Sequence, residues 1–186
     1  MQTELKRQMV HALGCLNAPI LFFLGKQYMI AFILSALTLV TILAWHRGKK
    51  KSFLWILFEK FVKSHERQTE KPYMGLITFY TGVMLAVVLF PINIAMIAII
   101  VLSVADATST LVGKLYGKHK LQINKIKSWE GSITFFFSAL IILLLASIDP
   151  KRALSVALFV TIVEGLPRLD DNVTIPISVG FALMFL

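Results

Sequence analysis

Long apolar runs without charged residues constrain this chain more than any other feature of its sequence. Several of them reach the length of about 20 residues that an α-helix needs to cross the hydrocarbon core of a bilayer. Hydrophobic residues make up 57% of the 186 residues and charged residues only 16%, whereas a typical soluble domain is less apolar and more charged. Because lipid offers the backbone no hydrogen-bond partners, such runs cross a membrane as helices. The sequence therefore predicts an all-α, polytopic transmembrane helix bundle.

Breaks between the apolar runs define the predicted crossings. The first four runs are separated by Gly25–Gln27, by a long basic loop and by Pro91. The predicted crossings are Met9–Leu24, Tyr28–Trp45, Tyr73–Phe90, Ile92–Val112, Gly131–Ile148, Ala153–Leu166 and Val173–Leu186. The last two runs are only 14 residues long, so that either one can be tilted or re-entrant. Seven crossings is the predicted count, six is the alternative, and residues 1–186 are expected to form one integral membrane domain.

Basic residues are distributed unevenly between the two sides of this predicted topology. With the N-terminus in the cytoplasm, all of the 19 Lys and Arg residues except Lys26, Lys151 and Arg152 fall in cytoplasmic segments. This is the bias that the positive-inside rule describes. The sequence therefore predicts a multi-pass protein whose N-terminus is cytoplasmic.

Residues 46–72 join the second and third predicted crossings and are strongly basic. Within them, Ser52–His65 is loosely amphipathic and follows a cluster of Arg and Lys residues. This composition suits a helix that lies on the anionic inner leaflet. A cytoplasmic extension of the second helix is an equal alternative, and neither interpretation gives the segment a chemical role.

Unusual polar residues fall at the cytoplasmic ends of the predicted crossings. Asp106 lies within the fourth crossing, and Ser109, Thr110 and Gly113 follow it on the same helical face. Because an ionised carboxylate in lipid is costly, a functional role for Asp106 is favoured over a structural hydrogen bond. The other polar residues at this side are Glu4, Lys6, Arg7 and His11, the basic loop with Lys114, Lys118, Lys120, Lys125 and Lys127, Glu130, and the acidic segment Glu164–Pro176.

Most of these residues also have a structural interpretation. Gly113 and Gly117 have the spacing that allows close helix packing, and the basic loop can serve only to set the topology. Ser128 can cap the fifth helix, with Glu130 as an acid favoured by the helix dipole. His11 alone is more often a hydrogen-bonded helix residue than a base.

The acidic segment is harder to explain by capping alone. Asp170, Asp171 and Asn172 can all cap the last helix, but one such residue is sufficient. Two adjacent carboxylates repel each other unless they share a cation. Carboxylate oxygens suit Mg²⁺, which takes one or two carboxylates together with phosphate oxygens, and neighbouring Lys residues would neutralise the remaining phosphate charge. Acidic and basic residues gathered at one membrane face thus indicate a nucleotide that meets a lipid.

Several familiar catalytic motifs are absent from the sequence. GKLYGKHK lacks the Ser or Thr of a G-x-x-x-x-G-K-[ST] phosphate-binding loop, and neither an H-E-x-x-H motif nor a cysteine cluster occurs. The sequence gives no indication of a nucleic-acid partner, and it leaves the oligomeric state open.

Four motifs of the chain resemble, in their order and spacing, those of the dolichol kinase, phytol kinase and CTP-dependent diacylglycerol kinase family. They are ELKRQMVHALG (Glu4–Gly14), DATSTLVGKLYGKHK (Asp106–Lys120), KSWEGS (Lys127–Ser132) and EGLPRLDDNVTIP (Glu164–Pro176). The last two are the most specific, and residues 46–72 lie outside the resemblance. The resemblance implies one catalytic domain over residues 1–186, with its active site at the cytoplasmic face. It implies a kinase that transfers the γ-phosphate of CTP, with Mg²⁺, to a polyprenol-, dolichol-, phytol- or diacylglycerol-type hydroxyl.

The resemblance also assigns roles to residues at matching positions. It implies catalytic roles for Asp106, Glu130, Glu164 and Asp171, metal binding by Asp106, Asp170 and Asp171, nucleotide or phosphate binding by Gly113, Gly117, Lys118, Lys120, Lys127 and Asn172, and auxiliary roles for Arg7 and His11. Either Glu130 or Glu164 is expected to position or deprotonate the lipid hydroxyl.

Two alternatives to a kinase remain open at this point. The family is distantly similar to membrane cytidylyltransferases, in which a lipid phosphate attacks the α-phosphorus of CTP to give a CDP-activated lipid. A small ion- or proton-coupled transporter with Asp106 as its ion site is the second alternative. It predicts polar residues at several depths along a path, whereas here they gather at one face.

Overall fold

The computed structural model describes residues 2–45, 56, 73–167 and 170–186. The predicted amphipathic segment within residues 46–72 therefore lies outside the described residues, apart from Ile56. The described elements are α1 (Gln2–Leu13), η1 (Gly14–Leu16), α2 (Asn17–Trp45), α4 (Met74–Leu89), α5 (Ile92–Ile100), η2 (Val101–Ala105), α6 (Asp106–Leu115), α7 (Trp129–Leu145), α8 (Pro150–Gly165) and α9 (Asp171–Phe185). The prediction of an all-α fold is confirmed.

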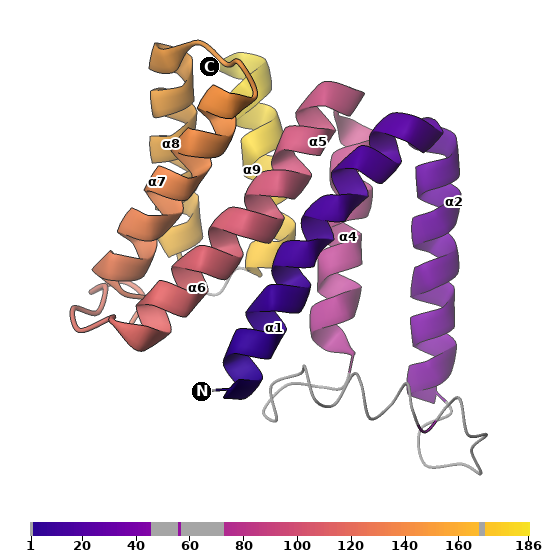
Figure 1. The fold of residues 1–186 in the computed structure, drawn as a ribbon, viewed down its shortest axis with the longest axis horizontal. Helices are drawn as coiled ribbons and strands as arrows, with labels where there is room; N and C mark the ends of the chain where they lie inside the picture. The colour runs from indigo at the N-terminus through magenta and orange to yellow at the C-terminus, as the bar shows by residue number, and fades with distance from the viewer. Residues whose placement is uncertain (1, 46–55, 57–72, 168–169) are drawn as a thin grey trace.

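The first reversal of the chain is made at Gly25. This residue has φ 77° and ψ 171°, whereas the rest of α2 is helical. Glycine adopts such a backbone conformation readily because it has no Cβ atom. Figure 1 shows that α1, η1 and the first part of α2 rise to this point and that the longer part of α2 runs back toward the end where α1 begins. The break that the sequence predicts at Gly25–Gln27 is therefore a helix reversal.

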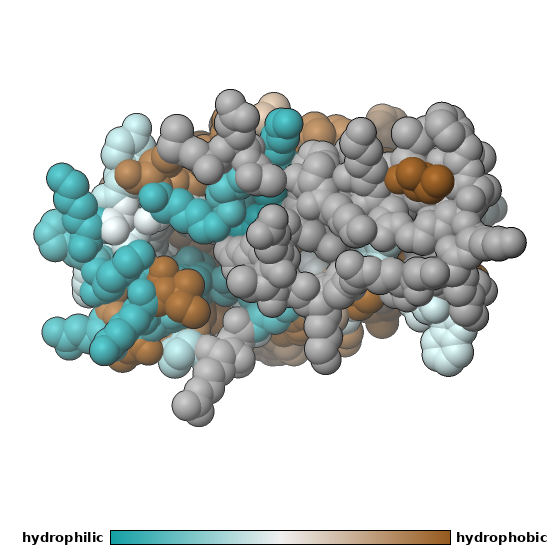
Figure 2. All heavy atoms as spheres, turned by 90° about the horizontal axis from the view of Figure 1, so that it is seen from below, coloured by the Kyte–Doolittle hydropathy of each residue, from teal (hydrophilic) through white to brown (hydrophobic). Residues whose placement is uncertain are grey.

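Successive helices alternate in direction, so that the connections gather at two ends of the bundle (Figure 1). The N-terminus, the α6–α7 loop and the α8–α9 connection lie at one end, which we call the polar end. The turns at Gly25, Pro91 and Asp149 and the C-terminus lie at the other end. Figure 2 shows hydrophilic residues gathered over one side of the polar end. This alternation agrees with the order of the predicted crossings.

The apolar character of the helices matches a membrane protein. Two helical stretches, Glu4–Ile42 and Ile92–Leu115, are long and apolar enough to cross a bilayer, and the first includes the reversal at Gly25. Three shorter helices, α4, α7 and α9, are also apolar. Large apolar side chains are exposed on the outer faces, as for Phe23 (81%) and Leu145 (80%), where lipid would cover them. The number of crossings stays a prediction.

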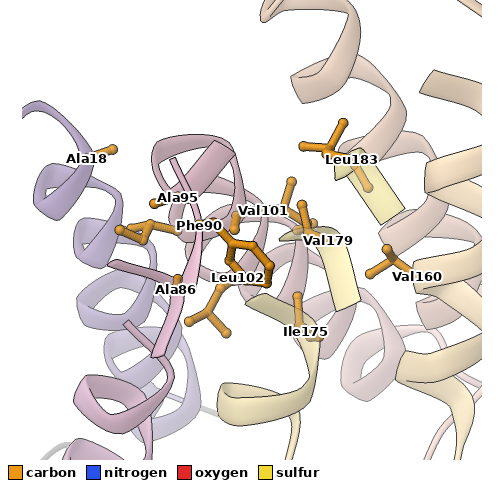
Figure 3. Packing of buried hydrophobic residues seen from close by; sticks show 14 of the residues in the cluster. Ala18, Ala86, Phe90, Ala95, Val101, Leu102, Val160, Ile175, Val179 and Leu183 are labelled. Carbon is orange, nitrogen blue, oxygen red and sulfur yellow. The ribbon is translucent and has the colours of Figure 1, made fainter. Parts of the chain in front are cut away.

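A continuous apolar core holds the helices together. α9 packs between α4 and α8, α7 packs between α6 and α8, and α2 lies against α4 and α5. Figure 3 shows Phe90 surrounded by Val101, Leu102, Ile175 and Val179, all of which are at most 1% exposed. α1 crosses this bundle along α6 and η2. The packing therefore places α1, α6, α7, α8 and α9 around the polar end.

Candidate active site

The fourth predicted crossing is interrupted by a π-helical turn immediately before Asp106. α5, η2 and α6 form one continuous helix, and η2 is the π-helical part. In a π-helical turn the hydrogen bonds run from residue i to i+5, and such turns are frequent at functional sites. The Nε2 atom of His11 in α1 lies 3.2 Å from the carbonyl oxygen of Leu102 and 3.3 Å from Oδ2 of Asp106. The turn thus brings a carbonyl and a carboxylate to one imidazole nitrogen.

A second cluster joins the α6–α7 loop to α8 and α9. The Lys127 ammonium lies 2.5 Å from Oε1 of Glu164 and 2.8 Å from Oδ2 of Asp171. The Ser132 hydroxyl in the first turns of α7 donates to Oε2 of Glu164 at 3.1 Å. Glu164 is only 3% exposed, so its charge depends on these partners. Lys127 therefore links the two acidic positions.

Electrostatics show that the two clusters are neighbours. Asp171 lies outside the predicted crossing Val173–Leu186. Burial raises the pKa of its carboxyl group, and the negative charges of Asp106 and Glu164 raise it further, whereas Lys127 opposes this shift. Burial lowers the pKa of Lys127, but the charges of Asp171 and Glu164 outweigh it, so that its pKa is above the ordinary value. The pKa of Asp171 is therefore raised although Lys127 lies beside it.

The loop that carries Lys127 is shaped by backbone pairing and by a helix cap. The N–H of Leu121 donates to the Lys127 carbonyl at 3.1 Å, and the N–H of Trp129 donates to the His119 carbonyl at 2.9 Å. Ser128 caps α7, with its hydroxyl accepting from the Gly131 N–H at 3.2 Å. These contacts fix Lys127 at the end of the loop, where it faces α8 and α9, and they confirm the predicted cap.

Glu130 has partners different from those of Glu164. Its Oε1 atom accepts hydrogen bonds from the backbone N–H groups of Lys118 (3.1 Å) and His119 (3.2 Å) and lies 2.8 Å from Nδ1 of His119. Glu130 therefore holds the start of the basic loop, while the side chains of Lys118 and Lys120 are exposed. Of the two glutamates predicted to act on the hydroxyl, the structure joins only Glu164 to the Lys127 cluster by direct contact.

The glycines predicted near the nucleotide lie at a helix contact. A Cβ atom on Gly113 would come within 3.1 Å of the Ser128 hydroxyl, and one on Gly117 would lie 2.5 Å from the same oxygen. Gly113 also faces Gly131, whose own Cβ position is 3.3 Å from the Gly113 Cα. The small residues therefore let α6 approach α7 closely, as their spacing predicts. Their predicted contact with a nucleotide stays a prediction.

The first turn of α9 separates the adjacent acidic residues. The Asp170 carboxylate is exposed and accepts a hydrogen bond from the Asn172 N–H at 3.0 Å, so it caps the helix. Asp171 instead reaches Lys127. Asn172 donates through Nδ2 to the Thr78 hydroxyl of α4 at 2.9 Å. The predicted role of Asp170 as a metal ligand stays a prediction, and its observed contact is a cap.

The predicted auxiliary residues of α1, Arg7 and His11, make different contacts. Arg7 pairs with Glu4 at 2.6 Å, and Lys114 of α6 forms an ion pair with the same carboxylate. These contacts attach α1 to α6, while His11 reaches Asp106 one turn later. Arg7 is therefore a partner of Glu4 in this structure, and His11 is in direct contact with a predicted catalytic carboxylate.

Contacts made by Ser132, Thr78 and Gly82 were missed by sequence reasoning. Ser132 belongs to the KSWEGS motif, which is the one signal that pointed to it. A Cβ atom on Gly82 would lie 1.8 Å from the carbonyl oxygen of Asn172, so α4 packs directly on the first turn of α9. Thr78 and Gly82 are four positions apart on one face of α4. That spacing of small residues in an apolar helix is a signal for close packing.

The donor set is suited to Mg²⁺ that arrives with a polyphosphate. Within the part of the chain that the structure describes, no three His, Cys, Asp or Glu side chains form a ready-made metal site. Mg²⁺ typically takes only one or two carboxylates and completes its shell with phosphate oxygens and water. Asp106 and Asp171 provide two carboxylates whose mutual repulsion a cation would relieve. The residues therefore fit the ion as part of a nucleotide complex.

Comparison with curated proteins shows that this chain is similar to a group of kinases. The chain is 32% identical to a probable chloroplastic phytol kinase of Zea mays over 64% of its own length, and 33% identical to a CTP-dependent diacylglycerol kinase of Schizosaccharomyces pombe over 43%. It is distantly homologous to phytol kinases and a CTP-dependent diacylglycerol kinase. The chain spans 46% and 37% of these two relatives, which is less than half of each. The resemblance seen in the four motifs is thereby confirmed.

A relative of similar length matches nearly the whole chain, and its description names no activity. An uncharacterized protein of Rickettsia prowazekii is 27% identical over 94% of the chain and 90% of its own length. No protein-family model matches the chain, and no solved structure matches it.

Proposed function

We propose that this protein is a membrane phosphotransferase that moves the γ-phosphate of CTP to the hydroxyl group of a lipid alcohol. The observation that carries this proposal is the position of Lys127, held between Glu164 and Asp171 at the polar end of an apolar helix bundle. The homology to phytol kinases and to a CTP-dependent diacylglycerol kinase supports the reaction class. The acceptor class, CTP as donor and the cytoplasmic position of the site belong to the proposal.

Different polar residues of the site would bind different parts of the nucleotide complex. Asp106 and Asp171 would hold Mg²⁺, which when bound neutralises charge on the β- and γ-phosphate oxygens. Lys127 faces the same carboxylates and would contact the phosphates from the protein side. The exposed Lys118 and Lys120 would attract the triphosphate from solution. Glu164, to which Ser132 donates a hydrogen bond, would hold Lys127 in position.

Phosphoryl transfer would need little covalent chemistry from these residues. The hydroxyl oxygen forms a bond to the γ-phosphorus, the bond from that phosphorus to the bridging oxygen breaks, and CDP leaves. The hydroxyl proton is lost to a carboxylate of the site. Because the transition state is loose, positioning and charge stabilisation contribute more than early proton removal. The apolar exterior of the helices suits an acceptor whose tail stays in the bilayer.

A labelling experiment tests this function. Purified protein receives CTP labelled at either the α- or the γ-phosphate, with Mg²⁺ and a panel of polyprenol, phytol, geranylgeraniol and diacylglycerol, or the corresponding lipid phosphates. The proposal expects γ-label, and no α-label, in at least one lipid alcohol. Label from the α-position in a lipid would identify a cytidylyltransferase instead. Absence of label from every acceptor would contradict a lipid-directed transferase.

A further inference from the structure

Ser103 carries a hydroxyl group that the fold buries without a hydrogen-bond partner. Its side chain is 0% exposed, and among the described residues only Ser103 Oγ and Arg152 Nε are buried polar side-chain atoms with no partner. Other hydroxyls in these helices, such as those of Thr81 and Thr161, donate to a carbonyl four residues earlier. Leaving a buried hydroxyl unpaired costs stability, and it is therefore a signal of function.

The surroundings of Ser103 place this hydroxyl beside the candidate active site. Ser103 belongs to the π-helical turn η2, about one helical turn before Asp106. The preceding residue, Leu102, offers its carbonyl to the same His11 nitrogen that contacts Asp106. Val101 and Leu102 are fixed in the apolar core beside Phe90 (Figure 3). The hydroxyl is thus held by a rigid element.

An aromatic ring and a glycine border the Ser103 hydroxyl on the side of α1 and α4. A Cβ atom on Gly14 would lie 3.0 Å from Ser103 Oγ and 2.4 Å from Cζ of Phe79. The Phe79 ring also packs edge-on against His11, with 5.2 Å between the ring centroids. A side chain at position 14 would therefore collide with the ring and crowd the hydroxyl. Ser103 faces Gly14 of η1, close to the Phe79 ring of α4.

The depth of Ser103 in the helix bundle indicates which part of a substrate would contact its hydroxyl group. Ser103 is farther than Asp106 from the polar end, because the α5–η2–α6 helix runs toward that end and Ser103 comes earlier. A nucleotide would approach the carboxylates and Lys127 from solution, whereas a lipid alcohol would bring its hydroxyl from the apolar interior. A neutral hydroxyl group in an apolar setting suits another neutral hydroxyl group.

We propose that Ser103 binds the hydroxyl group of the lipid acceptor and that Phe79 packs against the carbon atoms next to it. This inference rests on the proposed function, because it assigns the acceptor end of the same site. Ser103 would orient the acceptor oxygen beside His11 and Asp106, and Phe79 would shield the reacting group from water. The buried, unpaired hydroxyl of Ser103 then lowers the stability of the free protein and gains its hydrogen-bond partner when the substrate binds.

Replacement of Ser103 by Ala separates this role from a structural one. The change removes an unpartnered hydroxyl without adding bulk, so the melting temperature is expected to stay the same or rise. The KM for the lipid alcohol is expected to increase about 3- to 10-fold, the effect of losing one neutral hydrogen bond, while the KM for CTP does not change. Ser155→Ala, which alters an exposed hydroxyl on α8, is the matched control and should leave both KM values unchanged.

A binding measurement keeps the inference testable apart from catalysis. The shift in melting temperature is recorded with phytol and with phytane, its hydrocarbon counterpart that lacks the hydroxyl group. Wild-type protein should be stabilised more by phytol than by phytane, and Ser103→Ala should respond equally to both. This result supports the acceptor site even if no γ-label is transferred, which would refute the proposed function alone. An unchanged preference for phytol in Ser103→Ala, or a lowered melting temperature with both KM values altered, would overturn the assignment of Ser103.

Discussion

Replacement of Gly82 by Ala tests how α4 positions the acidic first turn of α9. The new methyl group would lie 1.8 Å from the carbonyl oxygen of Asn172 and 3.2 Å from Cγ of Pro176. In a regular helix that carbonyl would accept a hydrogen bond from residue 176, but proline has no N–H to donate. Gly82 therefore packs against a carbonyl to which Pro176 cannot donate, and the nearest atoms belong to the backbone rather than to a flexible side chain.

The size of the effect follows from this geometry. Real Cβ contacts are essentially never shorter than 3.0 Å, so the Asn172 carbonyl has to retreat by about 1 Å or more. Overpacking of this kind typically costs about 1–3 kcal/mol. In a chain of this length that loss lowers the melting temperature by roughly 2–12 °C. Because Asp171 precedes Asn172, its contact with Lys127 moves as well, and a displacement of about 1 Å in a positioned group can reduce turnover about 100-fold.

Two further glycine variants separate loss of stability from loss of positioning. In Gly180→Ala the added atom would meet the ring of Phe90 at 2.1 Å, far from the polar end, so stability falls without any direct effect on Asp171. In Gly165→Ala the nearest atom is Leu121 Cδ1 at 3.6 Å, an ordinary contact. Melting curves and γ-phosphate transfer per folded molecule are measured for all three. Full activity in a folded Gly82→Ala protein, or equal loss in Gly180→Ala, would refute the positioning role.

Three other changes address the charges of the site and the bend at the far end. Lys127→Met leaves the buried Glu164 without its cation and should lower the free energy of unfolding by about 3–5 kcal/mol. The double variant Lys127→Met, Glu164→Gln should recover much of this loss. Melting curves that show no recovery would contradict the pairing. Glu130→Ala removes the acceptor for two backbone N–H groups of the basic loop. The KM for CTP should rise about 3- to 10-fold, while the KM for lipid stays unchanged. An unchanged KM for CTP would argue against a nucleotide role for this loop. Gly25→Ala should lower the melting temperature, because Gly25 has a positive φ that alanine adopts only with strain. Both KM values should stay unchanged. A raised KM would show that the two ends of the bundle are coupled.

Much of the fold was predictable because the apolar runs are long and their breaks are distinct. Gly25 and Pro91 end their runs where the structure reverses the chain, and the basic residues predict which connections share an end. The helices extend beyond the predicted crossings. α1 begins at Gln2, before the crossing predicted from Met9, because the polar residues before Met9 are good helix formers although they are not apolar.

The candidate site was predictable in its members more than in its contacts. Asp106, Lys127 and Asp171 stand out as charges near apolar runs. In the structure Lys127 forms an ion pair with Asp171, and the charge of Asp106 raises the pKa of Asp171. The choice of partners depends on how the helices are rotated against one another, which periodicity within one helix does not determine. The π-helical turn before Asp106 and the fit of Gly82 on α9 arise from such contacts between helices. Both are therefore visible only in three dimensions.

Transfer of γ-phosphate in wild-type protein and in Asp171→Asn, measured side by side, tests the central claim most directly. Both proteins receive Mg²⁺, the lipid alcohol that wild-type protein uses, and CTP labelled at the γ-phosphate or, in a parallel reaction, at the α-phosphate. Melting curves confirm that both proteins are folded. The proposed site predicts labelled lipid phosphate with wild-type protein and a loss of at least about 100-fold with the variant, because one carboxylate near the phosphates is gone while the shape is kept. Full γ-transfer by Asp171→Asn would contradict the site, and α-label in the lipid would contradict the reaction.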